Sequence, residues 1–315
     1  MTTKPELYIF KLFPFIPKII ERSKKVVLPG FDRMPIYDVA IFFFQGIQKG
    51  ALTMRASAVA FNFFLAIFPA VIFLFTLIPY LPIENFREEL FTRLGTLLPK
   101  EAFILAKSTI DDLVSTPRGG LLSFGFILAL YFATNGINAM MGAFNQSTHI
   151  AKKRNFFLQQ MISILLVLIQ SFLIIIAIAL LAFGQLTLDF LTEKRIIAGG
   201  LNIFLLTAGQ WITIAALFYF AISFLYYFGP VIRGRWKFFS AGSSLATTLM
   251  LIVSLGFAFY VNNFGTYNKV YGSIGTLMVI MLWIQFNSIV LLIGFELNAS
   301  IRNAKQTHLE EGDKD

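Results

Sequence analysis

Residues 155–188 read NFFLQQMISILLVLIQSFLIIIAIALLAFGQLTL and contain no Asp, Glu, Lys or Arg. A helix needs about 20 consecutive apolar residues to cross the hydrocarbon core of a bilayer, so this segment predicts a membrane span. Backbone polar groups cannot face lipid without partners, and a helix satisfies them within the segment itself. This stretch therefore predicts an all-α integral membrane protein.

Five further stretches have the same character, because each lacks charged residues and is about 20 residues long or longer. They are residues 56–83, 119–148, 196–232, 238–268 and 270–295. Only Lys269 separates the last two, and the Asn and Gly residues around it favour a turn. We therefore predict six transmembrane helices within a transmembrane domain at residues 55–300.

Composition supports this fold class and argues against most catalytic chemistry. Hydrophobic residues make up 57% of the 315 residues and charged residues only 14%, against roughly 25% charged in a soluble domain. The absence of cysteine excludes disulfides and thiolate metal sites, and two histidines are too few for a histidine metal cluster. The HExxH, GxxxxGK[ST] and GxSxG motifs are also absent. We predict no catalytic residue, no metal, no cofactor and no enzymatic activity.

The positive charge indicates an orientation in the membrane. The short loops of one side hold Lys152, Lys153, Arg154, Arg233, Arg235 and Lys237, whereas those of the other side hold Lys194, Arg195 and Lys269. Short loops rich in Lys and Arg stay in the cytoplasm. Both termini are therefore predicted to be cytoplasmic. The net charge of +9 then reflects topology, and nucleic acid is not an expected partner.

Residues 1–54 are predicted to form a basic, amphipathic cytoplasmic region. Large apolar residues alternate there with Lys18, Arg22, Lys24 and Lys25, which suits a segment on the surface of an anionic membrane. A basic, partly disordered tail is the alternative. Apolar residues at helical spacing within residues 37–49 predict an interfacial elbow helix.

Three other segments complete the predicted architecture. The long outer loop, residues 84–118, has apolar residues at helical spacing on both sides of Pro99 and predicts a helical hairpin over the outer mouth of the bundle. Pro69 predicts a kinked or broken first span. Residues 301–315 are predicted to be a polar cytoplasmic tail.

Polar residues inside the spans mark helix contacts or water-filled cavities, because they are costly against lipid. In the second span, one polar stripe contains Asn135, Asn138, Asn145 and Gln146. These four residues are our candidates for a hydrophilic cavity or substrate path, and interhelical hydrogen bonding is the alternative. A weaker stripe in the third span contains Gln160, Ser163, Gln170 and Ser171.

Two charges stand at the predicted inner ends of spans. Arg55 opens the first span and Glu296 closes the last one. Pairing would lower the cost of burying both charges. The alternative is that each side chain extends separately to the interface.

Several segments carry a family resemblance. They are Arg55-Ala56-Ser57-Ala58-Val59-Ala60-Phe61, Gly229-Pro230 followed by Arg235-Trp236, and Tyr267-Asn268-Lys269-Val270-Tyr271-Gly272-Ser273-Ile274-Gly275 continuing through Leu282-Trp283-Ile284 to Gly294-Phe295-Glu296-Leu297-Asn298-Ala299. Together they resemble the YihY or BrkB family of bacterial envelope proteins over roughly residues 55–300.

The resemblance implies a bacterial inner-membrane protein of six helices that supports envelope integrity or transports lipids or other amphiphiles. We expect transport or flipping of an amphiphile, with anionic lipid headgroups as partners at the cytoplasmic face. A structural or interaction protein without transport is the alternative. Some family members carry a ribonuclease label, but the clustered His and carboxylate ligands of a metal-dependent nuclease are missing from this sequence. The oligomeric state does not follow from the sequence.

Overall fold

The computed structural model describes residues 21–49, 51–80, 111, 117–147, 154–193, 200–231, 237–263 and 266–312. In these ranges the regular structure is helical, apart from one antiparallel bridge between Val27 and Pro35. The main helices are α3 (Ile36–Lys49), α4 (Leu52–Leu77), α7 (Gly119–Ser147), α8 (Phe156–Glu193), α9 (Gly200–Phe228), α10 (Ala241–Asn263) and α11 (Thr266–Gly312).

Six of these helices, α4 and α7 to α11, are long and apolar enough to cross a membrane. Their apolar windows are Leu52–Leu77, Gly119–Ser147, Phe156–Leu180, Leu206–Phe228, Ala241–Val261 and Leu277–Glu310. The expectation of an all-helical, multi-pass membrane protein with six spans is confirmed to this extent.

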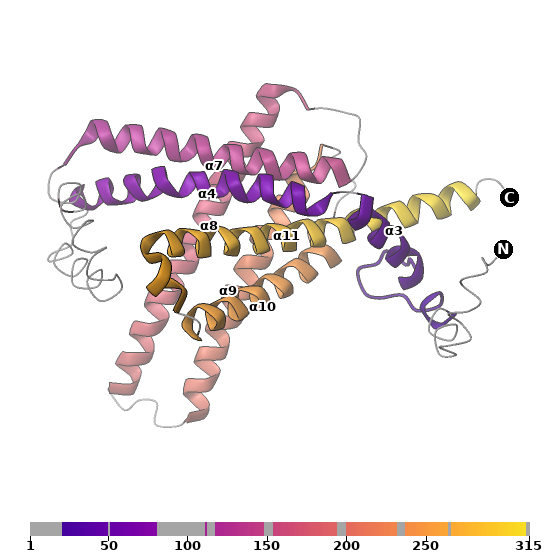
Figure 1. Ribbon diagram of the computed structural model, residues 1–315. Helices are drawn as coiled ribbons and strands as arrows, with labels where there is room; N and C mark the ends of the chain where they lie inside the picture. Colours follow the sequence, from indigo (N-terminus) through magenta and orange to yellow (C-terminus); the bar gives the residue numbers. More distant parts are fainter. Residues whose placement is uncertain are drawn as a thin grey trace.

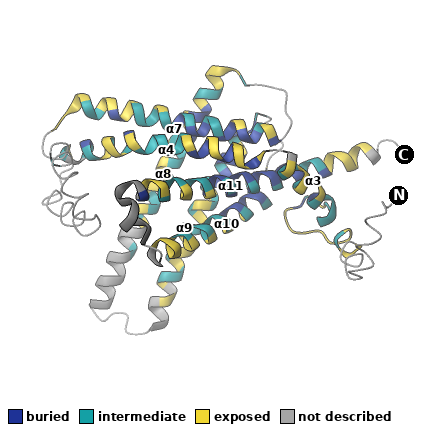
Figure 2. Cartoon of the chain, in the orientation of Figure 1, coloured by how far each residue is buried: buried dark blue, intermediate teal, exposed yellow. Residues whose placement is uncertain are grey.

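Exposed residues lie along much of the described helices (Figure 2), and many of them are large and apolar. Phe172 and Ile175 of α8 and Leu255 and Phe259 of α10 are all at least 60% exposed. Such a surface is unfavourable in water but fits hydrocarbon, which is as apolar as these side chains.

The bundle is assembled from packed helix pairs (Figure 1). Helix α4 packs along α7, and α10 packs along α11. Helix α11 also contacts α3, α4 and α7, and α8 contacts α7 and α9. In the view of Figure 1, α4, α7 and α11 run roughly side by side while α8 and α9 run across them.

An aromatic cluster joins α7, α9 and α11 at the core. The Phe144 and Phe295 rings stack with centroids 4.2 Å apart, and the Tyr226 ring stands edge-on to both. The Tyr226 hydroxyl donates a hydrogen bond to the carbonyl oxygen of Leu291 at 2.6 Å. Each of these rings is at most 1% exposed, so this cluster fixes the three helices against one another.

Helix α11 extends beyond the predicted last span and into the predicted polar tail. It runs unbroken to Gly312, where the sequence predicted a span ending at residue 295 and a tail from residue 301. The extension is fixed because Ile301 and Ala304 are buried against Phe31 and Val39 of the N-terminal segment. The C-terminal end of α11 and the N-terminal segment therefore lie together at one end of the bundle (Figure 1).

The first span, expected to be kinked or broken, is not broken at Pro69. Helix α4 continues through Pro69, and a short 3₁₀ helix, Ile78–Tyr80, begins only after Leu77. One missing N–H group removes a single hydrogen bond of the helix, which spans tolerate when their neighbours satisfy the freed carbonyl. The predicted hairpin, residues 84–118, lies outside the described residues except for Asp111, Pro117 and Arg118.

The predicted elbow helix is present as α3, and its side chains divide between core and surface. Val39 is buried and Phe42 and Ile47 pack against core clusters, whereas Phe44 is 62% exposed. Its position at a membrane interface stays a prediction.

Of the four basic residues assigned to the membrane surface, three are described and exposed: Arg22, Lys24 and Lys25. The Lys24 ammonium lies 5.0 Å from the centroid of the Tyr37 ring. Lys18 lies outside the described residues. Contact of these side chains with anionic lipid stays a prediction.

Candidate functional site

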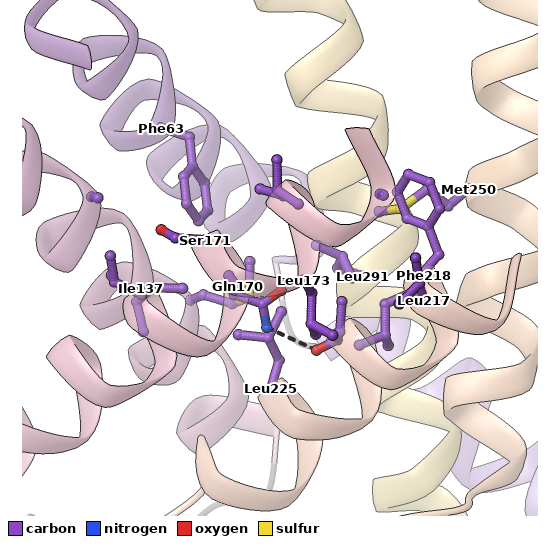
Figure 3. A pocket seen from close by; sticks show the side chains of 17 residues that line it. Phe63, Ile137, Gln170, Ser171, Leu173, Leu217, Phe218, Leu225, Met250 and Leu291 are labelled. Atoms are coloured by element: carbon purple, nitrogen blue, oxygen red, sulfur yellow. Dashed lines mark hydrogen bonds between the residues drawn. The ribbon is translucent and has the colours of Figure 1, made fainter. Parts of the chain in front are cut away.

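A cavity of about 370 Å³ lies between α7, α8 and α9 and is closed by single side chains of the other spans (Figure 3). We call it the membrane cavity. Helix α4 contributes Phe63, α10 contributes Met250 and α11 contributes Leu291. Every one of the six spans therefore has at least one side chain in its wall.

Small residues make this space. Ala133 of α7, Ala177 of α8 and Ala221 of α9 all line the cavity, and a methyl side chain leaves the gap between helices unfilled. Aliphatic and aromatic residues form almost all of the remaining wall. An apolar cavity of this kind stays dry and accepts an apolar ligand.

Gln170 of α8 is the main polar group of the membrane cavity. Its Nε2 donates a hydrogen bond to the carbonyl oxygen of Ala221 at 2.9 Å, which joins α8 to α9 (Figure 3). Its Oε1 has no hydrogen-bond donor among the described residues. The side-chain oxygen is thus an acceptor that a hydroxyl or amide of a ligand could use.

The cavity opens on the side of the bundle. Three residues of its wall, Ser171, Ile174 and Phe218, are exposed, with Ile174 at 58% and Phe218 at 39%. They lie on α8 and α9, inside the apolar windows of both helices. A lipid tail could therefore enter from the bilayer without passing through water.

The polar stripe of α7 contacts α8 through Asn138. Its Nδ2 donates to Gln160 Oε1 at 2.9 Å, and its Oδ1 accepts from Gln159 Nε2 at 3.2 Å and from Ser163 Oγ at 2.6 Å. These bonds are those expected if the stripe serves interhelical packing. The stripe of the third span is thus divided, because Gln160 and Ser163 bind Asn138 while Gln170 and Ser171 line the membrane cavity.

Asn145, at the end of α7, contacts the segment that follows α9. Its Oδ1 accepts a hydrogen bond from the backbone N–H of Val231 at 3.0 Å. Asn135 is half-buried and Gln146 is exposed. None of the four residues that the sequence assigned to a hydrophilic cavity lines the membrane cavity, whose α7 wall is Ala133, Ile137 and Met140. Their role in a substrate path stays a prediction.

Arg154 binds the segment after α9, next to the residue that Asn145 contacts. Its guanidinium donates to the carbonyl oxygens of Phe228, Gly229 and Pro230, the last at 2.6 Å. The final carbonyls of a helix have no partner within the helix, so this arginine satisfies the C-terminus of α9. The sequence indicated Arg154 only as a cytoplasmic charge.

Arg55 and Glu296 lie next to each other in the protein interior. Arg55 Nη2 is 3.8 Å from Glu296 Oε2, and the two side chains are 5% and 4% exposed. Arg55 Nη1 also donates to the carbonyl oxygen of Ala143 at 2.9 Å and to Ser147 Oγ at 2.6 Å. These contacts tie α4 to α7 and α11 at the end of the bundle that α3 covers.

Comparison with known proteins gives a consistent set of relatives. The family model described as virulence factor BrkB matches residues 43–315. A ribonuclease-like protein of Bacillus subtilis, YfkH, is 31% identical over 252 residues, which is 80% of this chain and 90% of that protein. A membrane protein of Aggregatibacter aphrophilus, of the group UPF0761, is 24% identical over 277 residues, covering 85% of this chain and 95% of its own length. No solved structure matches the chain.

Proposed function

This chain belongs to the BrkB family of membrane proteins, and we propose that it binds a lipid or other amphiphile inside the bilayer and moves it across a bacterial inner membrane. The membrane cavity is the observation that supports this proposal. Its volume of about 370 Å³ falls within the roughly 300–1,000 Å³ typical of ligand sites. Its apolar wall and side opening suit an acyl chain.

The polar groups beside the cavity suit a headgroup. Gln170 offers an acceptor within the cavity. Asn138 follows the cavity residue Ile137 on α7 but faces Gln159, Gln160 and Ser163 of α8. We propose that a headgroup follows the α7 stripe of Asn135, Asn138, Asn145 and Gln146. Such passage requires the hydrogen bonds between Asn138 and α8 to open. The tails would stay in lipid, which lowers the cost of crossing.

Filling the membrane cavity tests this function. Ala177→Phe is expected to slow the movement of a fluorescent phospholipid across vesicles that contain the purified protein. We expect a decrease of roughly tenfold or more, the effect of losing about 1.4 kcal/mol of binding free energy. The matched control is Ala216→Phe, because Ala216 of α9 is exposed and does not line the cavity. Unchanged transport by Ala177→Phe would exclude the cavity as the site.

The alternative is a structural or interaction protein that transports nothing, and the hydrogen bonds of Asn138 favour it. In that case Asn138→Leu lowers the melting temperature of the protein in detergent. Vesicles that contain the wild-type protein or this variant then move labelled lipid no faster than protein-free vesicles do. Lipid transport by the wild-type protein that Asn138→Leu abolishes, while the variant is still recovered folded, would instead support the substrate path.

The ribonuclease-like name is that of the Bacillus relative. Among the described residues, no group of three His, Cys, Asp or Glu side chains is placed to hold a metal ion. The described residues therefore provide no metal site that would support a metal-dependent nuclease.

We propose that both termini are cytoplasmic, and the absence of native cysteine makes this easy to test. A cysteine at Thr192, in the last turn of α8, should react with an impermeant thiol reagent added to intact cells. A cysteine at Thr307, near the end of α11, should react only after the membrane is opened. Labelling of position 307 in intact cells would reverse the orientation.

A further inference from the structure

A second cavity, of about 510 Å³, lies where the N-terminal segment meets the end of α11, and we propose that it binds the phosphate group of an anionic lipid. We call it the end cavity. Its walls are the turn at Gly30 and Asp32, the segment Lys237–Ser240 before α10, and the stretch of α11 from Asn298 to Leu309. It shares no residue with the membrane cavity, so this inference does not depend on the proposed transport function.

Three cationic side chains and one anionic side chain face the end cavity. The cations are Lys237, Arg302 and Lys305, and the anion is Asp32. The Asp32 carboxylate binds the Lys237 ammonium and lies 3.8 Å from the Lys305 ammonium. It therefore holds the two lysine ammonium groups at one place, and its single negative charge balances only one of their two positive charges.

The lysines remain accessible to a ligand. The side chains of Lys237 and Lys305 are 66% and 50% exposed. Charges at such positions attract a phosphate through water, and the attraction weakens as salt is added. A phosphate oxygen could replace part of the hydration shell of both ammonium groups at once.

The turn that carries Asp32 is fixed by the backbone. Gly30, Asp32 and Arg33 have φ values of 87°, 52° and 68°, and the N–H of Ile36 donates to the carbonyl oxygen of Val26 at 3.0 Å. An ideal Cβ on Gly30 would lie 3.3 Å from the Ala241 side chain, so this turn sits directly on the start of α10. The carboxylate that gathers the lysines is therefore held in place before any ligand arrives.

Two polar residues of the cavity wall, Asn298 and Ser240, already form hydrogen bonds within the protein. Asn298 Oδ1 accepts from the N–H of Gly242 at 2.8 Å, and Asn298 Nδ2 donates to Ser240 Oγ at 2.9 Å. Ser240 Oγ also accepts from the N–H of Ser243. Since the start of α10 is capped in this way, the cationic side chains carry the recognition of a phosphate.

Exposed apolar side chains around the cavity indicate that the phosphate comes from a lipid. Leu309 in the cavity wall is 62% exposed. Val26, Val27 and Leu28 precede the wall residue Gly30 in the chain and are 43–46% exposed, and Phe239, two residues after Lys237, is 65% exposed. Cationic and large apolar side chains together on one surface are typical of protein at the boundary between headgroups and acyl chains.

The test uses the full-length protein purified in a nonionic detergent, with its melting temperature followed during lipid addition. A ligand that binds only the folded state raises this temperature. We expect phosphatidylglycerol to raise it and phosphatidylcholine, which has no net charge, to raise it much less. The double variant Lys237→Gln and Lys305→Gln should need roughly tenfold more phosphatidylglycerol for the same rise, since each basic residue strengthens binding to anionic lipid severalfold.

The control double variant is Arg33→Gln and Arg118→Gln, which removes the same charge from exposed positions that do not line the end cavity. It should retain the response of the wild-type protein. Equal weakening by both double variants would show that diffuse surface charge binds the lipid, and it would overturn the proposal, as would equal responses to the two lipids. Competition by millimolar glycerol 3-phosphate, lost in the lysine variant alone, would support the site with a soluble phosphate as its ligand.

Discussion

Replacing Gly242 with valine is expected to prevent the protein from folding, because α10 and α11 touch through their backbones at this point. An ideal Cβ on Gly242 would lie 2.1 Å from the carbonyl oxygen of Gly294 and 2.6 Å from the side chain of Asn298. From the other helix, a Cβ on Gly294 would lie 2.6 Å from the carbonyl oxygen of Gly242 and from Ala246 Cβ. Small residues permit such close approach of helices in membranes.

The clash cannot be relieved by a change of rotamer. The nearest atom, the carbonyl oxygen of Gly294, belongs to the backbone, so α10 and α11 would have to move apart. Separation would break the hydrogen bond from the Gly242 N–H to Asn298 Oδ1 and loosen the packing of Ala246, which is fully buried. Overpacking alone costs about 1–3 kcal/mol, and we expect at least about 3 kcal/mol once the lost contacts are included.

The measurement is the yield and melting temperature of the detergent-extracted protein. Gly256→Val is the matched control, because Gly256 lies on the same helix and nothing comes within 4 Å of its ideal Cβ. Both variants replace a glycine of α10 with the same β-branched residue. A Gly242→Val protein as stable as the Gly256→Val protein would show that the two helices do not approach as closely as the structure indicates.

Neutralising Glu296 is expected to have the other large effect. Its carboxylate lies 3.8 Å from the Arg55 guanidinium, and both side chains are at most 5% exposed. Helix α3 closes over this pair: an ideal Cβ on Gly46 would lie 1.9 Å from Glu296 Oε1. Removing one partner of a buried ion pair costs about 3–5 kcal/mol.

A double-mutant cycle measures the coupling between these two charges. Glu296→Gln and Arg55→Gln should each lower the free energy of unfolding by about 3–5 kcal/mol. The double variant should be less unstable than the sum by about 0.5–3 kcal/mol. Glu310→Gln serves as control, because Glu310 is exposed near the end of α11. Additive effects would show that each side chain is stabilised separately, Arg55 by Ala143 and Ser147 for example.

The position of the spans could be predicted from hydropathy because lipid imposes the same demand on every span. The predicted stretch 119–148 corresponds to α7, Gly119–Ser147, almost residue for residue. The predicted stretch 270–295 ended at the charge of Glu296, whereas helix α11 continues to Gly312. Its continuation depends on contacts of Ile301 and Ala304 with the N-terminal segment, and these residues are more than 250 positions apart from their partners.

For the candidate sites too, the sequence indicated which residues share a helix face but not which other helix they contact. The sequence placed Asn138 on a polar face but left open whether that face meets water or another helix. In the structure, Asn138 forms hydrogen bonds with Gln159, Gln160 and Ser163 of α8. The membrane cavity had no sequence signal of its own, since Ala133, Ala177 and Ala221 are ordinary residues in spans and leave a gap only where three helices face each other.

The sequence by itself determined that this is a membrane protein, how many spans it has and to which family it belongs. Hydropathy, span length and short motifs are properties of contiguous residues. Tertiary structure alone decided which polar groups are spent on packing, where an acyl-sized cavity opens, and that Lys237 meets Asp32 across 205 positions of the chain. Each of these depends on how far one helix is rotated and shifted against another. Close-packed side chains set that rotation and shift, and no single segment carries the information for it.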